Sequence, residues 1–272
     1  MIVNYPRMRR RVKGWPDDLD TALEFSSANP FSISAPKNWD GKLEYTNGSG
    51  WKMWDGSAIA SGEIENNHYI YLRGTGNSKI TGTTSSSVKW SIIGTNIACN
   101  GDIDLLLDYS TVKNGNRPAM ASYCYSNMFQ GCTSLTAAPS LPATTLNTNC
   151  YYYMFYGCTS LTTAPSLPAT TLANNCYYSM FQGCTSLTTV PSLPATTLAN
   201  NCYNSMFYLC TKIKLSTTAS GTYTKSYRIP QNGTGTTASG ALVYMFGNTG
   251  GTFNGAPKIN TTYYLDESNT IV

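Results

Sequence analysis

Charged side chains are scarce in this sequence, where Asp, Glu, Lys and Arg together make up 12% of the 272 residues. From Pro118 to Thr211 there is no charged residue and no histidine, and the only histidine of the chain is His68. General acid–base catalysis needs such groups, and hard cations and phosphates need carboxylates, basic side chains or glycine-rich helix starts. The composition therefore indicates a non-enzymatic protein with no cofactor and no metal.

Long apolar runs are also missing. No window of about 18 apolar residues occurs, so we expect no membrane span. The first residues contain a basic run, but Gly14, Trp15 and Pro16 follow it instead of the apolar stretch that a secretory signal needs. We therefore expect that the chain is not exported by that route.

The basic run defines an N-terminal arm, residues 1–20. We interpret it as an arm that docks on an acidic partner surface, and the alternatives are a disordered tail or a contact with nucleic acid. Nucleic-acid binding as the main function is disfavoured, because the net charge is only +4 and no second basic patch follows. The residues expected to dock are Arg7, Arg9, Arg10, Arg11 and Lys13.

What the sequence does contain is a repeat with a strict period of 26 residues. Each unit has a cysteine, a Met-Phe pair four residues later and a second cysteine, and three units end in Pro-Ser-Leu-Pro-Ala-Thr-Thr-Leu. A degenerate fifth copy begins at Ala241. Units of this size cannot bury their apolar face alone, so the period predicts a stack with a shared core. The units begin at Cys124, Cys150, Cys176 and Cys202.

Spacing within a unit predicts a short helix. Cys124, Tyr125, Met128 and Phe129 fall on one helical face, and Gly131 suits the left-handed turn that ends a helix. The prolines that follow favour an extended segment. We therefore expect each unit to pair a short helix with an extended segment, around ladders of Met, Phe, Leu and Cys.

Eight of the nine cysteines lie in these units. Their C-x7-C spacing matches no common zinc or redox motif. We predict a ladder of buried, reduced thiols, and disulfides or a reactive thiolate are the alternatives. A reactive thiolate is the weakest of the three, because the repeats offer no cation to lower a thiol pKa.

Residues 21–87 alternate apolar and polar side chains with a period of two, and Asn47-Gly48 is typical of a hairpin turn. This pattern predicts an antiparallel β-sandwich. Its aromatic residues suit core or cross-strand positions better than a sugar-stacking cluster. Asp102 and Asp104 are expected on one face of a later strand, where no third ligand completes a calcium site. The aromatic residues in question are Trp51, Trp54, Tyr69 and Tyr71.

These patterns together predict a mixed α/β fold: an N-terminal antiparallel β-sandwich followed by a short leucine-rich-repeat-type solenoid with a C-terminal cap. The predicted parts are the arm (1–20), the β-sandwich (21–87), connecting strands with an N-terminal cap (88–121), the solenoid (122–215), and an insertion with a degenerate capping repeat (216–272).

Tyrosines occupy the positions at which the repeats differ. Helical geometry turns these positions away from the core, so the rings are expected at the surface. Neutral rings with hydroxyl groups suit a glycan or the polar surface of another protein, and the alternative is that they merely cover the flank of the stack. The candidate binding residues are Tyr152, Tyr153, Tyr156, Tyr178 and Tyr208.

The stretch "CYYSMFQGCTSLTTVPSLPATTLANN" resembles the leucine-rich repeats of the BspA-like (Treponema-type) class, over about residues 122–215. The β-region in front is more loosely similar to the domain often placed before such repeats. The resemblance implies a surface-displayed adhesion or recognition function in gut bacteria and their phages, without catalytic residues. This chain departs from the pattern because Leu209 replaces the unit glycine, the array is short, and the expected export signal is missing.

The missing signal favours a virion protein over an exported adhesin. We expect a phage head or tail fibre or decoration subunit, assembled in the host cytoplasm as a homo-oligomer. Its arm would bind other virion proteins, and its repeats would bind a host-surface or mucus glycan or protein. The alternatives are a bacterial cell-surface adhesin and, more remotely, a thiol-dependent or glycan-cleaving enzyme.

Overall fold

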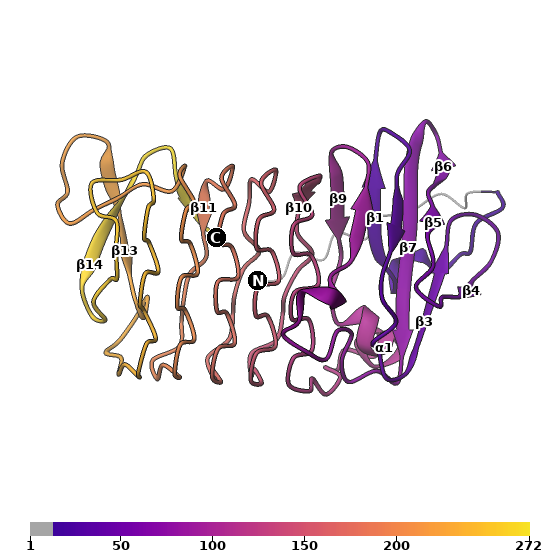
Figure 1. Ribbon diagram of the computed structural model, residues 1–272, viewed down its shortest axis with the longest axis horizontal. Helices are drawn as coiled ribbons and strands as arrows, with labels where there is room; N and C mark the ends of the chain where they lie inside the picture. Colours follow the sequence, from indigo (N-terminus) through magenta and orange to yellow (C-terminus); the bar gives the residue numbers. More distant parts are fainter. Residues whose placement is uncertain (1–12) are drawn as a thin grey trace.

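The computed structural model describes residues 13–272, and it is mainly β, with 25% strand and 6% helix. The predicted mixed α/β class is therefore wrong. The molecule is elongated, with a β-domain at one end, a stack of coils in the middle and small C-terminal sheets at the other end (Figure 1).

The β-domain is built on a seven-stranded sheet. Neighbouring strands are antiparallel except where β10, from the first repeat unit, runs parallel to β9. The predicted Asn47-Gly48 turn joins β3 to β4 as an antiparallel hairpin. In spatial order the strands are β10 (Leu135–Ala137), β9 (Ile97–Asn100), β1 (Leu23–Ser27), β7 (Asn67–Thr75), β3 (Lys42–Thr46) and β4 (Lys52–Met53), and β6 (Gly62–Ile64) also pairs with β7.

A three-stranded sheet contributes to the same core. Ile33, Ile59 and Ile92 of this sheet are buried in one cluster with Phe25 and Ile70 of the larger sheet. The β-domain extends beyond the predicted boundary at residue 87, since β8 and β9 both lie after it. The smaller sheet has the order β5 (Ile59–Ala60), β2 (Ser32–Ser34) and β8 (Ser91–Ile93).

Helical structure is confined to three short elements in the described residues. The segment read as a strand with Asp102 and Asp104 on one face is instead a turn that leads into a helix. That expectation was wrong because Leu105, Leu106 and Leu107 are buried in succession where the helix begins. The helices are η1 (Leu19–Thr21), η2 (Ser86–Val88) and α1 (Leu105–Lys113).

The repeats form five stacked coils that hydrogen-bond to one another through a ladder of turns. Within each of the first four ladders, five alternate N–H groups donate to carbonyls of the next coil, as Tyr151 does to Cys176 at 3.0 Å and Phe155 to Met180 at 2.9 Å. The degenerate fifth copy also takes part in this hydrogen bonding, since the N–H of Tyr203 donates to the carbonyl of Ala241. We call these segments the turn ladders; they span 123–131, 149–157, 175–183, 201–209 and 240–248.

The predicted helix is absent from the turn ladders because the neighbouring coil takes alternate N–H groups. The remaining groups bond three residues back within their own coil, as Met154 does to Tyr151 at 3.2 Å. An α-helix instead needs every N–H for a bond four residues back. Every fourth residue of a ladder also has a positive φ, which Gly and Asn tolerate best. In the first ladder, Asn127 and Gly131 take these positions, with φ of +61° and +74°.

The core ladders that the period predicted are present. Equivalent phenylalanines of successive coils stack with ring centroids 5.3–5.7 Å apart, from Phe129 to Phe246. Tyr125, Tyr151, Tyr177 and Tyr203 form a parallel buried column with spacings of 5.6–5.8 Å. Stacked copies of one side chain thus replace the single globular core of an ordinary domain.

The core runs without a break from the β-domain into the stack. Phe129 of the first coil packs against Phe25 at 6.2 Å and Trp90 at 6.1 Å, measured between ring centroids. Trp90 also donates its backbone N–H to the carbonyl of Met128 at 2.8 Å. The β-domain therefore covers the N-terminal end of the stack.

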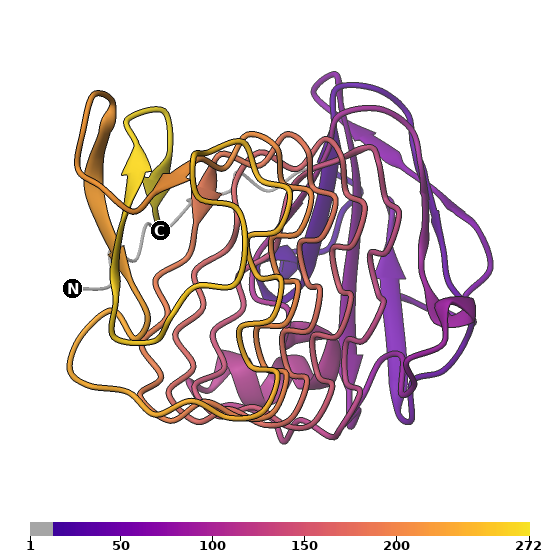
Figure 2. The same ribbon diagram turned by 60° about the vertical axis from the view of Figure 1, so that its left-hand side comes forward.

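The far end of the molecule carries a three-stranded sheet that forms within residues 215–266. A strand inserted between the fourth and fifth coils pairs with one that follows the fifth coil (Figure 2). The last residues of the chain return to pair in parallel with the third unit. The elements are β12 (Leu215–Ser216), β14 (Thr262–Asp266) and β13 (Tyr223–Arg228) in one sheet, and β11 (Thr189–Val190) with β15 (Thr270–Ile271) in the other.

Candidate functional site

Four of the five candidate tyrosines form one aromatic cluster on the second and third coils. The Tyr152 and Tyr153 rings stack with centroids 4.3 Å apart, and Tyr152 stacks on Tyr178 at 5.1 Å. Tyr156 lies 5.1 Å from Tyr153. All four side chains are half-buried, so each ring keeps some area for contact with solvent or a ligand. We call Tyr152, Tyr153, Tyr156 and Tyr178 the tyrosine cluster.

The fifth candidate, Tyr208, lies outside the cluster. It is on the fourth coil, where its ring contacts Tyr244 edge-on at 6.4 Å and its hydroxyl accepts a hydrogen bond from Asn248 Nδ2 at 2.9 Å. Tyr244 is 63% exposed. The sequence did not indicate it as a candidate, because it belongs to the degenerate fifth copy, where the repeat pattern is hard to follow. The structure therefore brings four of the five candidate tyrosines together and places Tyr208 apart from them.

The turn geometry explains which variable positions reach the surface. In the first coil, the pair equivalent to Tyr152 and Tyr153 is buried, with Ser126 and Asn127 at most 1% exposed. Ser179 is likewise 1% exposed. The expectation that all these pairs face solvent was wrong, because it assumed helical geometry. The tyrosines at these positions are partly exposed, and so are Asn204 and Ser205 of the fourth coil.

The backbone of Tyr153 has an unfavourable conformation. Its φ is +56°, in a region that bulky residues rarely adopt and that costs on the order of 1–3 kcal/mol. The bond from its N–H to the carbonyl of Tyr178, at 3.0 Å, helps to hold this conformation. Ser179 and Ser205 occupy the equivalent position in the next two coils, with φ of +49° and +53°.

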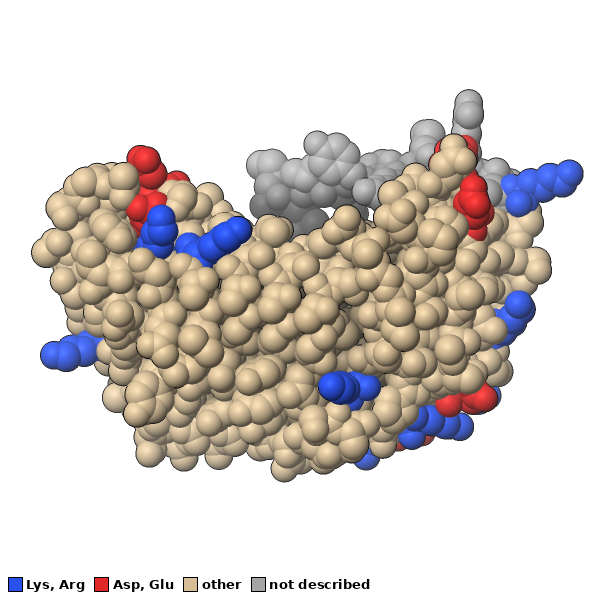
Figure 3. All heavy atoms as spheres, turned by 45° about the horizontal axis from the view of Figure 1, so that its top comes forward, with Lys and Arg blue, Asp and Glu red and all other residues tan. Residues whose placement is uncertain are grey.

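The cluster is electrically neutral. Burial, and then the neighbouring Tyr153, raise the pKa of Tyr152 well above its usual range, and the same causes raise the pKa of Tyr178. These phenols therefore stay protonated at physiological pH. The surrounding coils carry no charged residue, and Figure 3 shows one face on which charged side chains gather mostly over the two ends of the molecule.

Most of the predicted docking arm lies outside the described residues. This applies to Arg7, Arg9, Arg10 and Arg11, whereas Lys13 is described and exposed. The arm therefore remains a prediction.

The four aromatic residues of the β-domain are divided between two faces. Trp54 is 3% exposed in the core, where it stacks on Trp39 at 5.3 Å. Tyr69 and Tyr71 stack on each other at 5.9 Å and pack, with Trp51, in a separate small cluster. The structure thus favours packing roles and does not bring the four rings together as one sugar-stacking surface.

Arg73 fixes the chain segment before β1 to the sheet. Its guanidinium forms ion pairs with Asp18 at 2.5 Å and Glu44 at 3.0 Å, and it lies 3.9 Å from the Trp51 ring and 4.3 Å from the Tyr109 ring. Partial burial opposes ionisation of Asp18, but hydrogen bonds from Trp51 and Arg73 keep its pKa below the ordinary value. No sequence pattern pointed to this cluster.

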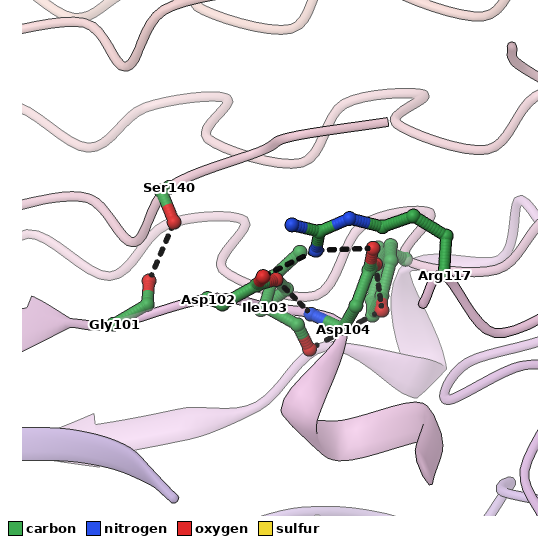
Figure 4. Close-up of polar contacts among 7 residues, drawn as sticks. Gly101, Asp102, Ile103, Asp104, Arg117 and Ser140 are labelled. Carbon is green, nitrogen blue, oxygen red and sulfur yellow. Dashed lines mark hydrogen bonds and ion pairs between the residues drawn. The ribbon is translucent and has the colours of Figure 1, made fainter. Parts of the chain in front are cut away.

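Asp102 and Asp104 come together with Arg117 at the junction of the β-domain and the stack (Figure 4). Arg117 contacts Asp102 closely and Asp104 at 3.4 Å, and the buried Tyr125 hydroxyl donates to Asp104 Oδ1 at 3.1 Å. Burial and then repulsion from Asp102 raise the pKa of Asp104 to about 6, although Tyr125 and Arg117 favour its ionised form. Among residues 13–272, no group of three or more His, Cys, Asp or Glu side chains is placed to hold a metal ion.

Replacing Asp104 with Asn should remove a pH dependence of stability. Because the folded-state pKa of about 6 exceeds the ordinary 3.8, the folded state binds the proton more tightly, and stability falls as pH rises from about 4 to 6. At pH 7 Asp104→Asn should therefore be more stable than the parent by about 2 to 3 kcal/mol, and at pH 4 the difference should vanish. Urea unfolding at both pH values measures this, with the exposed Asp20→Asn as control. Equal parent and Asp104→Asn curves at both pH values would show that Asp104 is not desolvated.

All nine cysteines are buried and unpaired, as the reduced-ladder prediction required. The second cysteine of a unit donates its thiol to a phenylalanine carbonyl of the preceding coil: Cys158 to Phe129 at 3.1 Å and Cys184 to Phe155 at 3.1 Å. Burial raises the pKa of every one of these thiols, to about 12 at Cys184. The thiols thus act as small apolar residues with a weak hydrogen-bond donor.

Comparisons with protein-family models, curated proteins and solved structures find no match. The resemblance to BspA-like repeats therefore rests on the repeat motif alone. Over residues 13–272, no helix is both long and apolar enough to cross a membrane.

Proposed function

We propose that this protein is a non-enzymatic recognition module whose tyrosine cluster binds a neutral polymer, with a host-surface or mucus glycan as the first candidate. The observation that carries the proposal is the cluster itself: four half-buried, neutral rings within 4.3–5.7 Å of their neighbours, on coils without charge. Such rings offer flat contact area and hydroxyl groups without the cost of desolvating a charge.

The buried thiols support a non-enzymatic role. A nucleophilic cysteine needs a lowered pKa and access to substrate, whereas these thiols are buried with raised pKa values. A larger assembly would display the module. Our first candidate is a phage virion, with the N-terminal arm bound to other virion proteins, and the second is a bacterial cell surface. Mass spectrometry of purified virions tests this location.

Replacing Tyr152, Tyr153 and Tyr178 together with Ser should abolish glycan binding without unfolding the stack. Ser already occupies the position of Tyr153 in the next two coils, so the turn ladder tolerates it. Binding to immobilised mucin and to an array of neutral glycans measures the effect, and we expect affinity to fall at least about tenfold, or 1.4 kcal/mol. The matched control is Tyr223→Ser with Tyr244→Ser, two tyrosines outside the cluster.

Two results would contradict the proposal. Equal binding by the triple variant and the parent would show that the rings only cover the flank of the stack. Failure of the parent to bind any neutral glycan would reject the glycan as the ligand.

A further inference from the structure

The C-terminal end of the stack has backbone donors without acceptors. In each of the first four turn ladders, five alternate N–H groups donate to a following coil, and the equivalent groups of the last coil belong to Gly240, Leu242, Tyr244, Phe246 and Asn248. Phe246 donates to the carbonyl of Gly255 at 2.9 Å. The other four N–H groups have no acceptor among residues 13–272. Gly255 already takes the acceptor place beside Phe246, between Tyr244 and Asn248, so we call the contiguous N–H groups of Gly240, Leu242 and Tyr244 the donor edge.

An apolar cavity lies beside the donor edge. Its volume is about 350 Å³, and it separates the last coil, at Ala241 and Leu242, from the loop that carries Pro257 and Ile259. Lys258 is the only charged residue of its lining. Val243, which also lines the cavity, is 39% exposed, and the adjacent Tyr244 is 63% exposed. The end of the stack that comes forward in Figure 2 thus combines unpaired donors with exposed apolar surface.

The inner coils show which groups accept hydrogen bonds from N–H groups of this kind. Every inner ladder donates to peptide carbonyls of another coil, and Phe246 of the last ladder donates to the peptide carbonyl of Gly255. All carbonyls of the donor edge point elsewhere, since those of Gly240, Leu242 and Tyr244 accept bonds within the coil from the residues three positions later. A regular strand presents both donors and acceptors along its edge, so it matches this donor-only edge poorly.

A second copy of this chain does not fit the edge. Two copies that meet through their C-terminal ends would set donors against donors. The acceptor end of a second copy is covered by its β-domain, where Ile80 and Trp90 donate to Cys124 and Met128.

We propose that the donor edge binds a coil of the same turn type, supplied by a partner polypeptide that carries this kind of repeat. Three alternate carbonyls of the partner accept from Gly240, Leu242 and Tyr244. An aromatic side chain of the partner enters the cavity above Leu242, which continues the buried column of Tyr125, Tyr151, Tyr177 and Tyr203. The site is distinct from the tyrosine cluster, so this proposal does not depend on glycan binding.

Amide hydrogen exchange followed by NMR tests the proposal. In the free protein, the amides of Leu242 and Tyr244 should exchange faster than the bonded amides of Tyr203 and Ser205, by at least about tenfold. The probe is a synthetic peptide that copies residues 174–199 with Cys176→Ser and Cys184→Ser. On its addition, the amides of Gly240, Leu242 and Tyr244 should become protected.

A cavity-filling variant adds a second measurement. Ala238 lines the cavity, and Ala238→Trp should weaken peptide binding at least about tenfold, measured by fluorescence polarisation. Ile93→Trp, at an exposed apolar position of the β-domain, is the matched control and should bind as the parent does. The exchange measurement on the parent stands even if Ala238→Trp does not fold.

Three outcomes would overturn the proposal. The first is that the peptide does not bind, and the second is that it binds without protecting the three amides. The third is that these amides are already protected in the free protein. Protection that increases with protein concentration would identify a second copy as the occupant, and protection independent of concentration would show that the edge is not open.

Discussion

Phe155→Ala should lower the free energy of unfolding by about 3 to 5 kcal/mol. Phe155 is fully buried and stacks between Phe129 at 5.5 Å and Phe181 at 5.6 Å. Its removal opens a cavity with rings on both sides, and the coils cannot close it without breaking the cross-coil bonds that set their spacing. Such a loss is a large share of the roughly 5–15 kcal/mol that stabilises a typical domain.

Urea unfolding followed by far-ultraviolet circular dichroism measures the loss. Gln182→Ala, at the half-buried position after Phe181, is the control and should change stability by less than about 0.5 kcal/mol. Because each coil contacts only its neighbours, we expect the destabilised coils to open first, and amide exchange in 149–157 and 175–183 should accelerate most. If the Phe155→Ala variant were as stable as the parent, the assignment of the phenylalanine column to the core would be wrong.

Arg73→Met should destabilise the β-domain by about 2 to 3 kcal/mol, because it removes a buried guanidinium from two partly exposed carboxylates that solvent screens in part. The Arg73 side chain is only 9% exposed, and it alone joins Asp18 to Glu44. The variant should also release the segment before β1, so limited proteolysis should cleave near residue 18 faster than in the parent. Lys89→Met, at an exposed position, is the control.

The pH dependence separates this effect from lost packing. The pKa of Asp18 is depressed in the folded state, so the contribution of its pair with Arg73 is present at neutral pH and is lost as pH falls below the ordinary aspartate range. The gap between parent and Arg73→Met should therefore narrow below about pH 4. A gap that is the same at pH 7 and pH 3.5 would assign the whole effect to packing of the Arg73 side chain against Trp51 and Tyr109.

The period of the repeat predicted the stack and its buried columns, because Met, Phe, Leu and Cys recur at fixed positions that each coil must bury. The local conformation was not predictable from the spacing of Cys124, Tyr125, Met128 and Phe129 alone. That spacing fits a helical face, but the bond partners of alternate N–H groups lie 25 residues away, as in Phe129 to Met154. A better signal was the recurrence of Asn or Gly at most of the fourth positions, since these residues tolerate positive φ best.

The tyrosine cluster was predictable in part, because Tyr152, Tyr153 and Tyr178 stand where the units differ. Their half-buried state was not, since it depends on how rings of neighbouring coils stack. The Arg73 cluster gave no local signal, because Asp18, Glu44 and Arg73 come from three separate segments. Interactions of this kind become visible only when the strand order is known.

The direction of the cross-coil hydrogen bonds has a mechanical consequence. These bonds point along the stack, from each coil to the next, so a pull between the β-domain and the C-terminal sheets loads the coil boundaries in series. Each boundary between turn ladders is held by five N–H bonds and by the stacked rings. In a series arrangement the rupture force is that of the weakest boundary, whereas the extension before rupture increases with the number of coils. Adding units would therefore make such a module more compliant without making it stronger.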